Sequence, residues 1–466
     1  MWRPSNVNPS HALRFHSTRG ESPPLGFTET FAAGLAPDGG LYIPESLPDI
    51  TSLIRLSPVP YPELAADFFR LFDDEHSPGE VEALMTRSYS TFPDAANAAP
   101  LVQVAENTFV LELFHGPTLA FKDFGLQLVG NLFEDQISRT GMPVNILGAT
   151  SGDTGSAAIN GLADKKDARV FILYPQGRIS ELQERQMTCT GSENIFPIAI
   201  EGSFDDAQNI VKDLFGDLEF KARANLSAVN SINLIRILAQ CVYYIHAFNQ
   251  LPENKRNALR FVVPTGNFGN ILAGWLTSRM GLPAGCFVVA TNQNDLLYRL
   301  FTSGRYQQGE VSHSLAPSMD IQVASNFERF LHYHLEGDSA HTTRIMAQVK
   351  AGEAVDLPDF EPEKFTATRT DDQGILENIR ITMENTGYLT DPHTACAFQD
   401  INPAIPTIIL ATAHPAKFPE TIRKAIDKQP EHSSLEALKS RNPRNVSIPA
   451  TCSAVRDYLE ENILKG

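Results

Sequence analysis

Short apolar runs rich in β-branched residues alternate with amphipathic stretches along most of the 466-residue chain, and this alternation constrains the fold more than any other feature. Each run is apolar throughout, as expected for strands that are covered on both faces in a parallel sheet. The candidate strands are residues 144–148, 168–174, 195–200, 259–264, 287–291 and 406–412. Strand–helix alternation on this scale predicts an α/β fold with a mainly parallel sheet.

The helices between these runs have readable starts, and two regions depart from the alternation. Ser203 stands before an apolar stripe with helical spacing and has Asp206 three residues later, which is typical of a capped helix N-terminus. The first 100 residues are rich in Pro and Gly, with a PDGG turn at 37–40, and predict an N-terminal subdomain or lid. Between about 338 and 372 the chain becomes acidic and its periodicity weakens, which predicts a variable excursion.

The balance of charge and the cysteine pattern exclude several classes of protein. The chain carries 55 acidic residues against 38 Lys plus Arg, a formal net charge of −17. Nucleic acid or an anionic membrane is therefore not expected as the main partner, because both need clustered positive charge. No run approaches the roughly 18 apolar residues of a membrane helix. Five scattered cysteines without a C-x-x-C pair argue against a disulfide framework or a zinc site.

The same cysteine usage favours reduced thiols and a cytoplasmic location. Arg3, Arg14 and Arg19 precede the first acidic residue, so an organelle transit peptide stays open as a minor alternative. An apolar h-region is missing at the N-terminus, which excludes a secretory signal.

The loop after the run 144–148 reads ATSGDTGS (149–156), and five of its eight residues are Ser, Thr or Asp. Ligands bind at the carboxyl ends of the strands in open α/β sheets, so such loops matter most. Its hydroxyl groups and glycines stand at the start of a helix, which offers free N–H groups to an anion such as a carboxylate. An ordinary helix cap needs only one such residue. The loop therefore predicts a binding site for an anion.

A second loop, TGNFGN (265–270), follows the run 259–264. Its glycines allow close backbone approach, and the helix after it presents its positive end to a phosphate. The spacing is G-x-x-G, so the dinucleotide pattern G-x-G-x-x-G is absent, and the chain contains no P-loop. A small phosphorylated ligand is the remaining prediction.

Lys122 lies in the apolar stretch FHGPTLAFKDF (114–124). Most lysines are solvated, but burial here would disfavour the charged form and leave an amine nucleophile able to form a Schiff base. A buried amine, a phosphate loop and a carboxylate loop together indicate pyridoxal phosphate acting on an amino acid. The combination is far more specific than any of its members.

Other polar residues fit the same site less specifically. The run 406–412 ends in Thr412 and is followed by His414 and Lys417 near a Pro turn, and the stretch SAVNSINLIRILAQ (227–240) opens a helix with several polar residues. His393 and His414 are not expected to bind a metal, because neither has a paired His or carboxylate at helical spacing. His115 fits loop packing as well as a proton shuttle.

With these residues assembled, the sequence resembles the threonine synthase family, in the longer form found in yeast and many bacteria. The motifs follow the family order along nearly the whole chain. They are STRG (17–20), LAPDGGLYIP (35–44), RSYSTF (87–92), LELFHGPTLAFKDF (111–124), LGATSGDTGSAAI (147–159), YPQGRIS (174–180), NSIN (230–233), PTGNFGN (264–270), SNFERFL (325–331), DPHTA (391–395) and TAHPAKF (412–418).

The resemblance implies a fold-type II pyridoxal-phosphate enzyme, similar to the tryptophan synthase β chain, with two open, mainly parallel α/β domains. The expected division is an N-terminal subdomain at 1–100, a large cofactor-binding domain at 101–135 and 236–466, and a smaller domain at 136–235. The cofactor is expected between the two larger units.

The resemblance also implies roles for individual residues. Lys122 matches the Schiff-base lysine, Thr412 the partner of the pyridine nitrogen, and Asp153 a neighbour of the cofactor ring oxygen. The cofactor-phosphate loop corresponds to Gly266, Asn267, Phe268, Gly269 and Asn270. Residues matching the substrate site are Thr150, Ser151 and Thr154 for the carboxylate and Arg178, Ser180 and Asn233 for the phosphate.

The implied reaction converts O-phospho-L-homoserine and water into L-threonine and phosphate, in a monomer or weak homodimer. Threonine synthase-like proteins of animals share these motifs, so a phospho-lyase that releases 2-oxobutanoate, ammonia and phosphate stays open. A binding protein that keeps the fold without turnover is the other alternative, and intact Lys122 and Thr412 argue against it.

Overall fold

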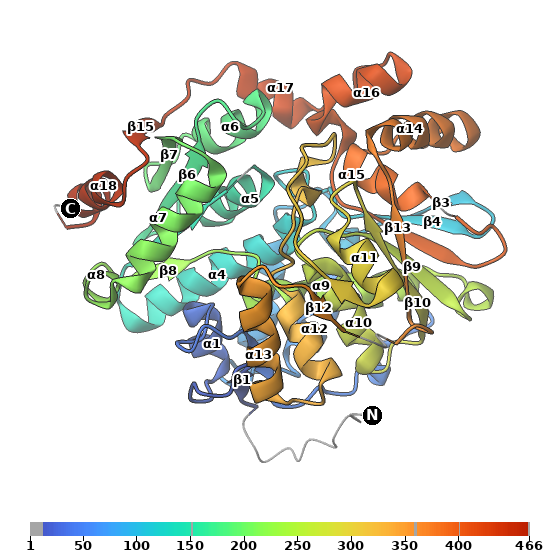
Figure 1. Cartoon of the computed structure of the whole chain (residues 1–466), viewed down its shortest axis with the longest axis horizontal. Helices are drawn as coiled ribbons and strands as arrows, with labels where there is room; N and C mark the ends of the chain where they lie inside the picture. The colour runs from blue at the N-terminus through green and yellow to red at the C-terminus, as the bar shows by residue number, and fades with distance from the viewer. Residues whose placement is uncertain (1–12, 151, 358–360, 400, 465–466) are drawn as a thin grey trace.

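The computed structural model describes residues 13–150, 152–357, 361–399 and 401–464. Two separate sheets organise the chain, and helices cover both of their faces (Figure 1). The larger sheet has the order β13-β10-β9-β14-β4-β3, and its pairs are parallel except for the hairpin of β3 and β4. Its strands are β3 (Leu101–Ala105), β4 (Thr108–Glu112), β9 (Leu259–Pro264), β10 (Ala284–Thr291), β13 (Phe365–Arg369) and β14 (Thr407–Ala411).

The smaller sheet has the order β15-β7-β6-β5-β8 and is parallel throughout its described pairs. Its strands are β5 (Val144–Ala149), β6 (Ala168–Pro175), β7 (Ile195–Glu201), β8 (Leu226–Ala228) and β15 (Val446–Pro449). The helices around it are α5 (Asp153–Leu162), α6 (Glu181–Thr188), α7 (Phe204–Gly216), α8 (Leu218–Arg223) and α18 (Cys452–Leu464). Mainly parallel sheets in two units confirm the predicted fold class.

All six predicted strands occur, and only the last one shrinks, from 406–412 to β14. The predicted cap is also present, because Ser203 Oγ accepts the Asp206 N–H at 3.1 Å at the start of α7. The edge strands β3, β8, β13 and β15 were not predicted, since short edge strands lack a continuous apolar run, and the interior strand β4 of the larger sheet was missed as well. The division into 1–100, 136–235 and the rest stays a prediction, and the structure adds that β15 pairs with β7 of the smaller sheet.

The region 338–372, predicted as a variable excursion, contains regular structure. It forms α13 (Ser339–Lys350), the short strand β12 (Val355–Asp356), which pairs with β11 (Arg305–Tyr306), and the edge strand β13 of the larger sheet. The other helices along residues 269–439 are α10 (Gly269–Arg279), α11 (Leu296–Ser303), α12 (Phe327–His334), α14 (Asp372–Thr386), α15 (Pro392–Ala395), α16 (Pro419–Ile426) and α17 (Ser433–Lys439).

The N-terminal segment packs on two long helices, α4 (Lys122–Thr140) and α9 (Leu234–Gln250), which run through the interior. Its elements are β1 (Phe15–Ser17), α1 (Phe27–Ala33), β2 (Tyr42–Pro44), α2 (Tyr61–Phe69) and α3 (Pro78–Tyr89). Phe124 of α4 contacts the rings of Tyr61 and Phe92, with centroids 5.3 and 4.8 Å apart. The segment therefore shares the largest apolar core of the molecule and does not form a core of its own.

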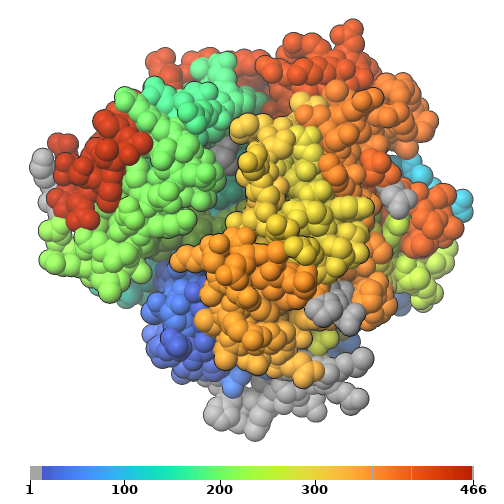
Figure 2. Space-filling view, viewed as in Figure 1, coloured from blue at the N-terminus to red at the C-terminus, as the bar shows by residue number. Residues whose placement is uncertain are grey.

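The two units leave a hollow at the surface between the part of the chain around residue 200 (green) and the part around residue 310 (yellow), as Figure 2 shows. Among the helices of the described ranges, none combines the length and apolar character needed to cross a bilayer.

Two glycines set the distance between α4 and α5, the helices that carry Lys122 and Asp153 at their first positions. A Cβ on Gly130 would lie 1.9 Å from the Gly161 carbonyl oxygen, so backbone meets backbone. We expect Gly130→Ala to lower the free energy of unfolding by about 1–3 kcal/mol or more, since the helices must separate. Urea denaturation measures this loss, and Gly79→Ala in α3, where nothing lies within 4 Å, is the matched control. Equal stability of the two variants would contradict the prediction.

A buried histidine joins the N-terminal segment to α4. His76 Nδ1 lies 2.8 Å from Asp73 Oδ2, and its Nε2 lies 3.0 Å from Asp135 Oδ2. The hydrogen bond that His76 donates to the Asp73 carboxylate raises the pKa of His76 to about 9, against the opposing effect of burial. The imidazolium is therefore the form that the folded protein binds between two carboxylates.

This pKa predicts a pH-dependent loss of stability. The folded-state value of about 9 exceeds the ordinary 6.5, so the contribution is complete below pH 6.5 and disappears as the pH rises through 9. We expect His76→Gln to lower the free energy of unfolding at about pH 6 and to have little effect at about pH 10. Urea denaturation at both pH values tests this, with exposed His313→Gln as control. A His76→Gln effect of equal size at both pH values would argue against it.

Candidate active site

A pocket lies where the carboxyl ends of strands from both sheets face each other. The loops after β5 and β9, the residue after β14 and the start of α4 all contribute to it, which is the position expected for ligands in open α/β sheets. Its lining includes Phe121, Lys122, Asp153, Thr154, Ser231, Arg236, Gln240, Thr265, Gly266, Asn267, Phe268, Gly269, Asn270, Ser318, His393 and Thr412. Nine of the sequence-predicted site residues are in this set.

Lys122 is held at the pocket by the backbone before α4. The Phe121 N–H donates to the Thr412 carbonyl oxygen at 2.9 Å, and Ala120 forms a bridge with Ala413. These contacts connect the start of α4 to the end of β14, so Lys122 and Thr412 line the same pocket. The Lys122 side chain is 12% exposed and its Nζ lies 3.6 Å from Asp153 Oδ2.

The electrostatics around Lys122 weaken the basicity of its amine. Burial lowers the pKa of Lys122, the Asp153 carboxylate opposes this, and the positive charges of Lys417 and Arg236 lower the pKa further. Burial alone would raise the pKa of Asp153, but the ammonium groups of Lys417 and Lys122 outweigh it and lower that pKa. The site therefore keeps its carboxylate ionised while weakening the basicity of its amine.

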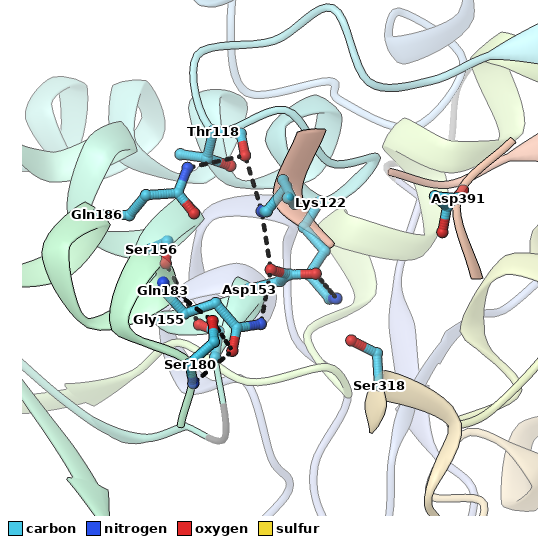
Figure 3. A network of polar contacts seen from close by, with 12 residues as sticks. Thr118, Lys122, Asp153, Gly155, Ser156, Ser180, Gln183, Gln186, Ser318 and Asp391 are labelled. Atoms are coloured by element: carbon cyan, nitrogen blue, oxygen red, sulfur yellow. Dashed lines mark hydrogen bonds and ion pairs between the residues drawn. The ribbon is translucent and has the colours of Figure 1, made fainter. Parts of the chain in front are cut away.

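A network of hydrogen bonds surrounds Asp153 (Figure 3). Its Oδ1 accepts from Lys417 Nζ at 2.8 Å and from Gln183 Nε2 at 3.2 Å. Gln183 Oε1 in turn accepts from the Ser180 hydroxyl at 3.1 Å. Ser180 is therefore connected to the pocket through Gln183 and Asp153, while its own Oγ caps α6 by accepting the Gln183 N–H.

The loop from Gly266 to Asn270 is tightly packed. Phe268 adopts the left-handed conformation with φ 62°, and its buried ring stacks on Phe301 at a centroid distance of 5.9 Å. A Cβ on Gly266 would lie 3.1 Å from the Ser318 carbonyl oxygen, so a side chain here would force the turn Pro317–Met319 to shift by a few tenths of an ångström. The loop leads into α10, whose first-turn N–H groups lack partners within the helix. This arrangement suits a phosphate group.

Two buried donors in the pocket have no protein acceptor. The hydroxyls of Tyr243 and Tyr244 donate to Asn270 Oδ1 at 2.6 and 3.1 Å, which leaves Asn270 Nδ2 without a partner. Arg236 Nη1 is likewise buried and unpartnered. Burial lowers the pKa of Arg236 to about 10, so the guanidinium stays charged at neutral pH. Unsatisfied buried donors are costly, and an anionic ligand would satisfy both of these.

His393 fixes the turn that covers the glycine loop. Its Nδ1 lies 3.0 Å from Asp391 Oδ1, and its Nε2 accepts the Ser318 N–H at 3.1 Å. Both ring nitrogens of His393 therefore have partners within the fold. Within the described ranges, no group of three or more His, Cys, Asp or Glu side chains is arranged to hold a metal ion.

Several predicted substrate residues have structural partners outside the pocket lining. Thr150 Oγ1 accepts the N–H groups of Gly152 and Gly155 at 3.0 and 2.9 Å and so shapes its own loop. Asn233 caps α9 by accepting the Ile235 N–H. Asn233 Nδ2 donates to the Phe31 carbonyl oxygen at 2.9 Å. Arg178 is exposed, and Ser151 lies outside the described residues.

The sequence placed Arg236 and Lys417 in stretches that fit this site but gave neither of them a specific role. Arg236 stands in the apolar run LIRIL (234–238), and a charge inside such a run was a signal that could have been used. Lys417 has a fully buried side chain, and its partner Asp153 is too far away in the chain for any local pattern to connect them.

Family models match three consecutive parts of the chain. The model of pyridoxal-phosphate dependent enzymes matches residues 95–406, the threonine synthase N-terminal model 14–89, and the threonine synthase C-terminal model 393–459. The chain is 42% identical to threonine synthase of Pseudomonas aeruginosa over 97% of its length and 99% of the relative. It is also 42% identical to the Saccharomyces cerevisiae enzyme, over 98% of this chain and 99% of the relative.

Solved structures agree with these matches. The crystal structure of threonine synthase from Brucella melitensis with bound pyridoxal phosphate is similar at a TM-score of 0.92 and 40% identity, over 97% of this chain and 99% of that one. The yeast threonine synthase structure is similar at a TM-score of 0.88 and 39% identity, with the same coverage.

Proposed function

The chain belongs to the threonine synthase family of pyridoxal-phosphate-dependent enzymes, and on that premise we propose that it converts O-phospho-L-homoserine and water into L-threonine and phosphate. The observation that carries the proposal is one pocket that contains the amine of Lys122 and two unpartnered buried donors, Arg236 Nη1 and Asn270 Nδ2. A weakly basic amine suits an aldehyde cofactor, and unpartnered donors suit phosphate groups.

The residues present fit pyridoxal phosphate. Lys122 would hold its aldehyde carbon, and the Thr412 hydroxyl would meet its ring nitrogen. The loop 266–270, with Asn270 Nδ2 and the start of α10, would hold its phosphate. When bound, the cofactor supplies an electron sink that stabilises negative charge on the carbons of an amino acid.

The substrate would be held by the remaining polar groups. Thr154, together with Ser151 and the N–H groups at the start of α5, would bind the carboxylate. Arg236 is the best candidate for the substrate phosphate, because it lines the pocket with an unpartnered Nη1, whereas Lys122 and the buried Lys417 already pair with Asp153. The assignment of Arg178, Ser180 and Asn233 to that phosphate stays a prediction.

Lys122 Nζ would move the protons of the reaction. A neutral amine takes the proton from the substrate Cα, and its low basicity allows a proton to be returned to the carbon chain. Arg236 would stabilise the phosphate as its bond to Cγ breaks, and water then adds at Cβ. The protein is therefore a carbon–oxygen lyase in this proposal.

Product analysis tests the activity. We expect purified protein with added pyridoxal phosphate to release threonine and phosphate in equal amounts from O-phospho-L-homoserine. Chromatography of the amino acids, with an assay for 2-oxobutanoate, gives the product ratio. If 2-oxobutanoate and ammonia were the main products, the chain would be a phospho-lyase, and the synthase proposal would be wrong.

We further propose that the enzyme is a monomer or weak homodimer in the cytoplasm. The five cysteines are all in the described part of the chain and are free, which suits a reducing compartment. Light scattering on the purified protein over a range of concentrations measures the oligomeric state.

A further inference from the structure

Two lysines share the carboxylate of Asp153, and they do so unequally. Lys417 Nζ lies 2.8 Å from Oδ1, whereas Lys122 Nζ lies 3.6 Å from Oδ2. The Lys417 side chain is fully buried, at 0% exposure, while that of Lys122 is 12% exposed and lines the pocket. The carboxylate therefore has one tightly held cation and one loosely held cation.

Lys417 is fixed by a second acceptor. Its Nζ also donates to the Thr118 carbonyl oxygen at 2.9 Å. Thr118 is itself held by Asp123, whose carboxylate accepts from the Thr118 N–H at 2.9 Å and from the Thr118 hydroxyl at 2.7 Å. The Thr118 carbonyl oxygen also accepts from Gln186 Nε2 at 3.1 Å. In Figure 3, Thr118 and Gln186 lie in the upper part of the network and Asp153 lies below them. Lys417 is thus anchored between the starts of α4 and α5.

We propose that Lys417 is a positioning residue of the active site, the permanent positive partner of Asp153 that allows Lys122 to give up its own charge. This inference rests on the proposed function, because it assigns Lys122 as the amine that bonds the cofactor. An amine reacts with an aldehyde only when its lone pair is free, joining nitrogen to the carbonyl carbon and releasing one water.

The physical reason is the balance of charge among Lys122, Lys417 and Asp153. With Lys417 present, loss of the Lys122 proton leaves a complete ion pair of Lys417 and Asp153. Without Lys417, loss of the same proton would leave Asp153 as an uncompensated buried carboxylate, which is strongly unfavourable. Lys122 would then be retained as the ammonium partner of Asp153, and its nitrogen would be a poor nucleophile.

The other charged groups around Lys122 shift its pKa, or the pKa of Asp153, in defined directions. Arg236 from α9 lowers the pKa of Lys122 together with Lys417, and His393 from α15 lowers that of Asp153. On α4 itself, burial raises the pKa of Asp123 to about 6, and its hydrogen bonds with Thr118 limit the rise. Lys417 is the cation among them that contacts the Asp153 carboxylate more closely than Lys122 does.

The test is a spectroscopic pH titration of the full-length holoenzyme. The visible absorption band of the cofactor bonded to Lys122 changes as the linking nitrogen loses its proton, so the midpoint pH reports the charge environment of that nitrogen. In Lys417→Gln the amide can still donate to Thr118 and Asp153, but the charge is lost. We expect its midpoint to rise by about one pH unit or more. Lys417→Arg keeps the charge and should restore the wild-type midpoint.

Lys424→Gln, at an exposed position of α16, is the matched control and should leave the midpoint unchanged. A Lys417→Gln protein with a wild-type midpoint and only lower stability would overturn the inference, because Lys417 would then be purely structural. Absence of any Lys122-dependent band in the wild type would instead overturn the proposed function.

If Lys417→Gln does not fold, the same question is answered in proteins that lack the carboxylate. Asp153→Asn with Lys417 is expected to have a lower midpoint than the double variant Asp153→Asn/Lys417→Gln, because only the first keeps a positive charge beside Lys122. Equal midpoints would contradict the role of Lys417.

Discussion

Lys122→Ala is expected to lose the visible cofactor band and to lower kcat by on the order of 10³-fold or more. The variant removes both the nitrogen that bonds the cofactor and the base that moves protons. The side chain is 12% exposed, and its charged partner Asp153 keeps its ion pair with Lys417. The fold should therefore survive, and the unfolding midpoint should stay close to that of the wild type.

Absorption spectra after incubation with pyridoxal phosphate, followed by steady-state kinetics, measure the two effects. Lys424→Ala, at an exposed position on α16, is the control and should keep both the band and the activity. A Lys122→Ala protein that retains the band would mean that another amine bonds the cofactor, and the assignment of the site would be wrong.

Arg236→Met is expected to weaken substrate binding and at the same time to stabilise the free protein. A charge-assisted hydrogen bond to phosphate contributes about 1.5–3 kcal/mol, so KM for O-phospho-L-homoserine should rise by roughly 10- to 100-fold. In the absence of an anion, the buried guanidinium has an unpartnered Nη1, and its removal relieves that cost. Function and stability are therefore predicted to change in opposite directions.

Thermal unfolding with and without inorganic phosphate separates the two effects. Phosphate should raise the unfolding temperature of the wild type, because a ligand stabilises the state that binds it, and should raise that of Arg236→Met less. Arg329 offers a matched control, since it is also buried but donates to the Tyr42 carbonyl oxygen, Asn326 Oδ1 and the Ile232 carbonyl oxygen. Arg329→Met should only destabilise. If Arg236→Met does the same, Arg236 has a structural role and the proposal is wrong.

Local sequence patterns were sufficient to predict six of the strands, the two loops at their ends and the importance of Lys122. Apolar runs such as 259–264 must be buried on both faces, and parallel strands place their carboxyl ends at one edge. That rule places the loops 149–156 and 265–270 each at the carboxyl edge of its own sheet, and the packing of the two sheets brings them to one pocket. Of the residues in these two loops, Asp153, Thr154 and 265–270 line one pocket.

Polar residues in helix-start motifs were harder to interpret. Asn233 and Ser180 were assigned to the substrate phosphate, but in the structure their side chains cap α9 and α6. A side-chain oxygen that can bind a ligand can equally accept the free N–H groups of a helix. The sequence does not distinguish these two uses, because the choice depends on which way the chain turns before the helix.

By itself, the amino-acid sequence determined the α/β class, six of the strands and the lysine that faces the ligand loops, since these depend on short-range periodicity and on general rules of sheet topology. Only the tertiary structure decided which charges pair. Lys417 reaches Asp153, and His76 reaches Asp135, across long stretches of chain. Electrostatic pairing acts over a few ångströms of space and is independent of separation along the chain, so no local pattern could reveal it.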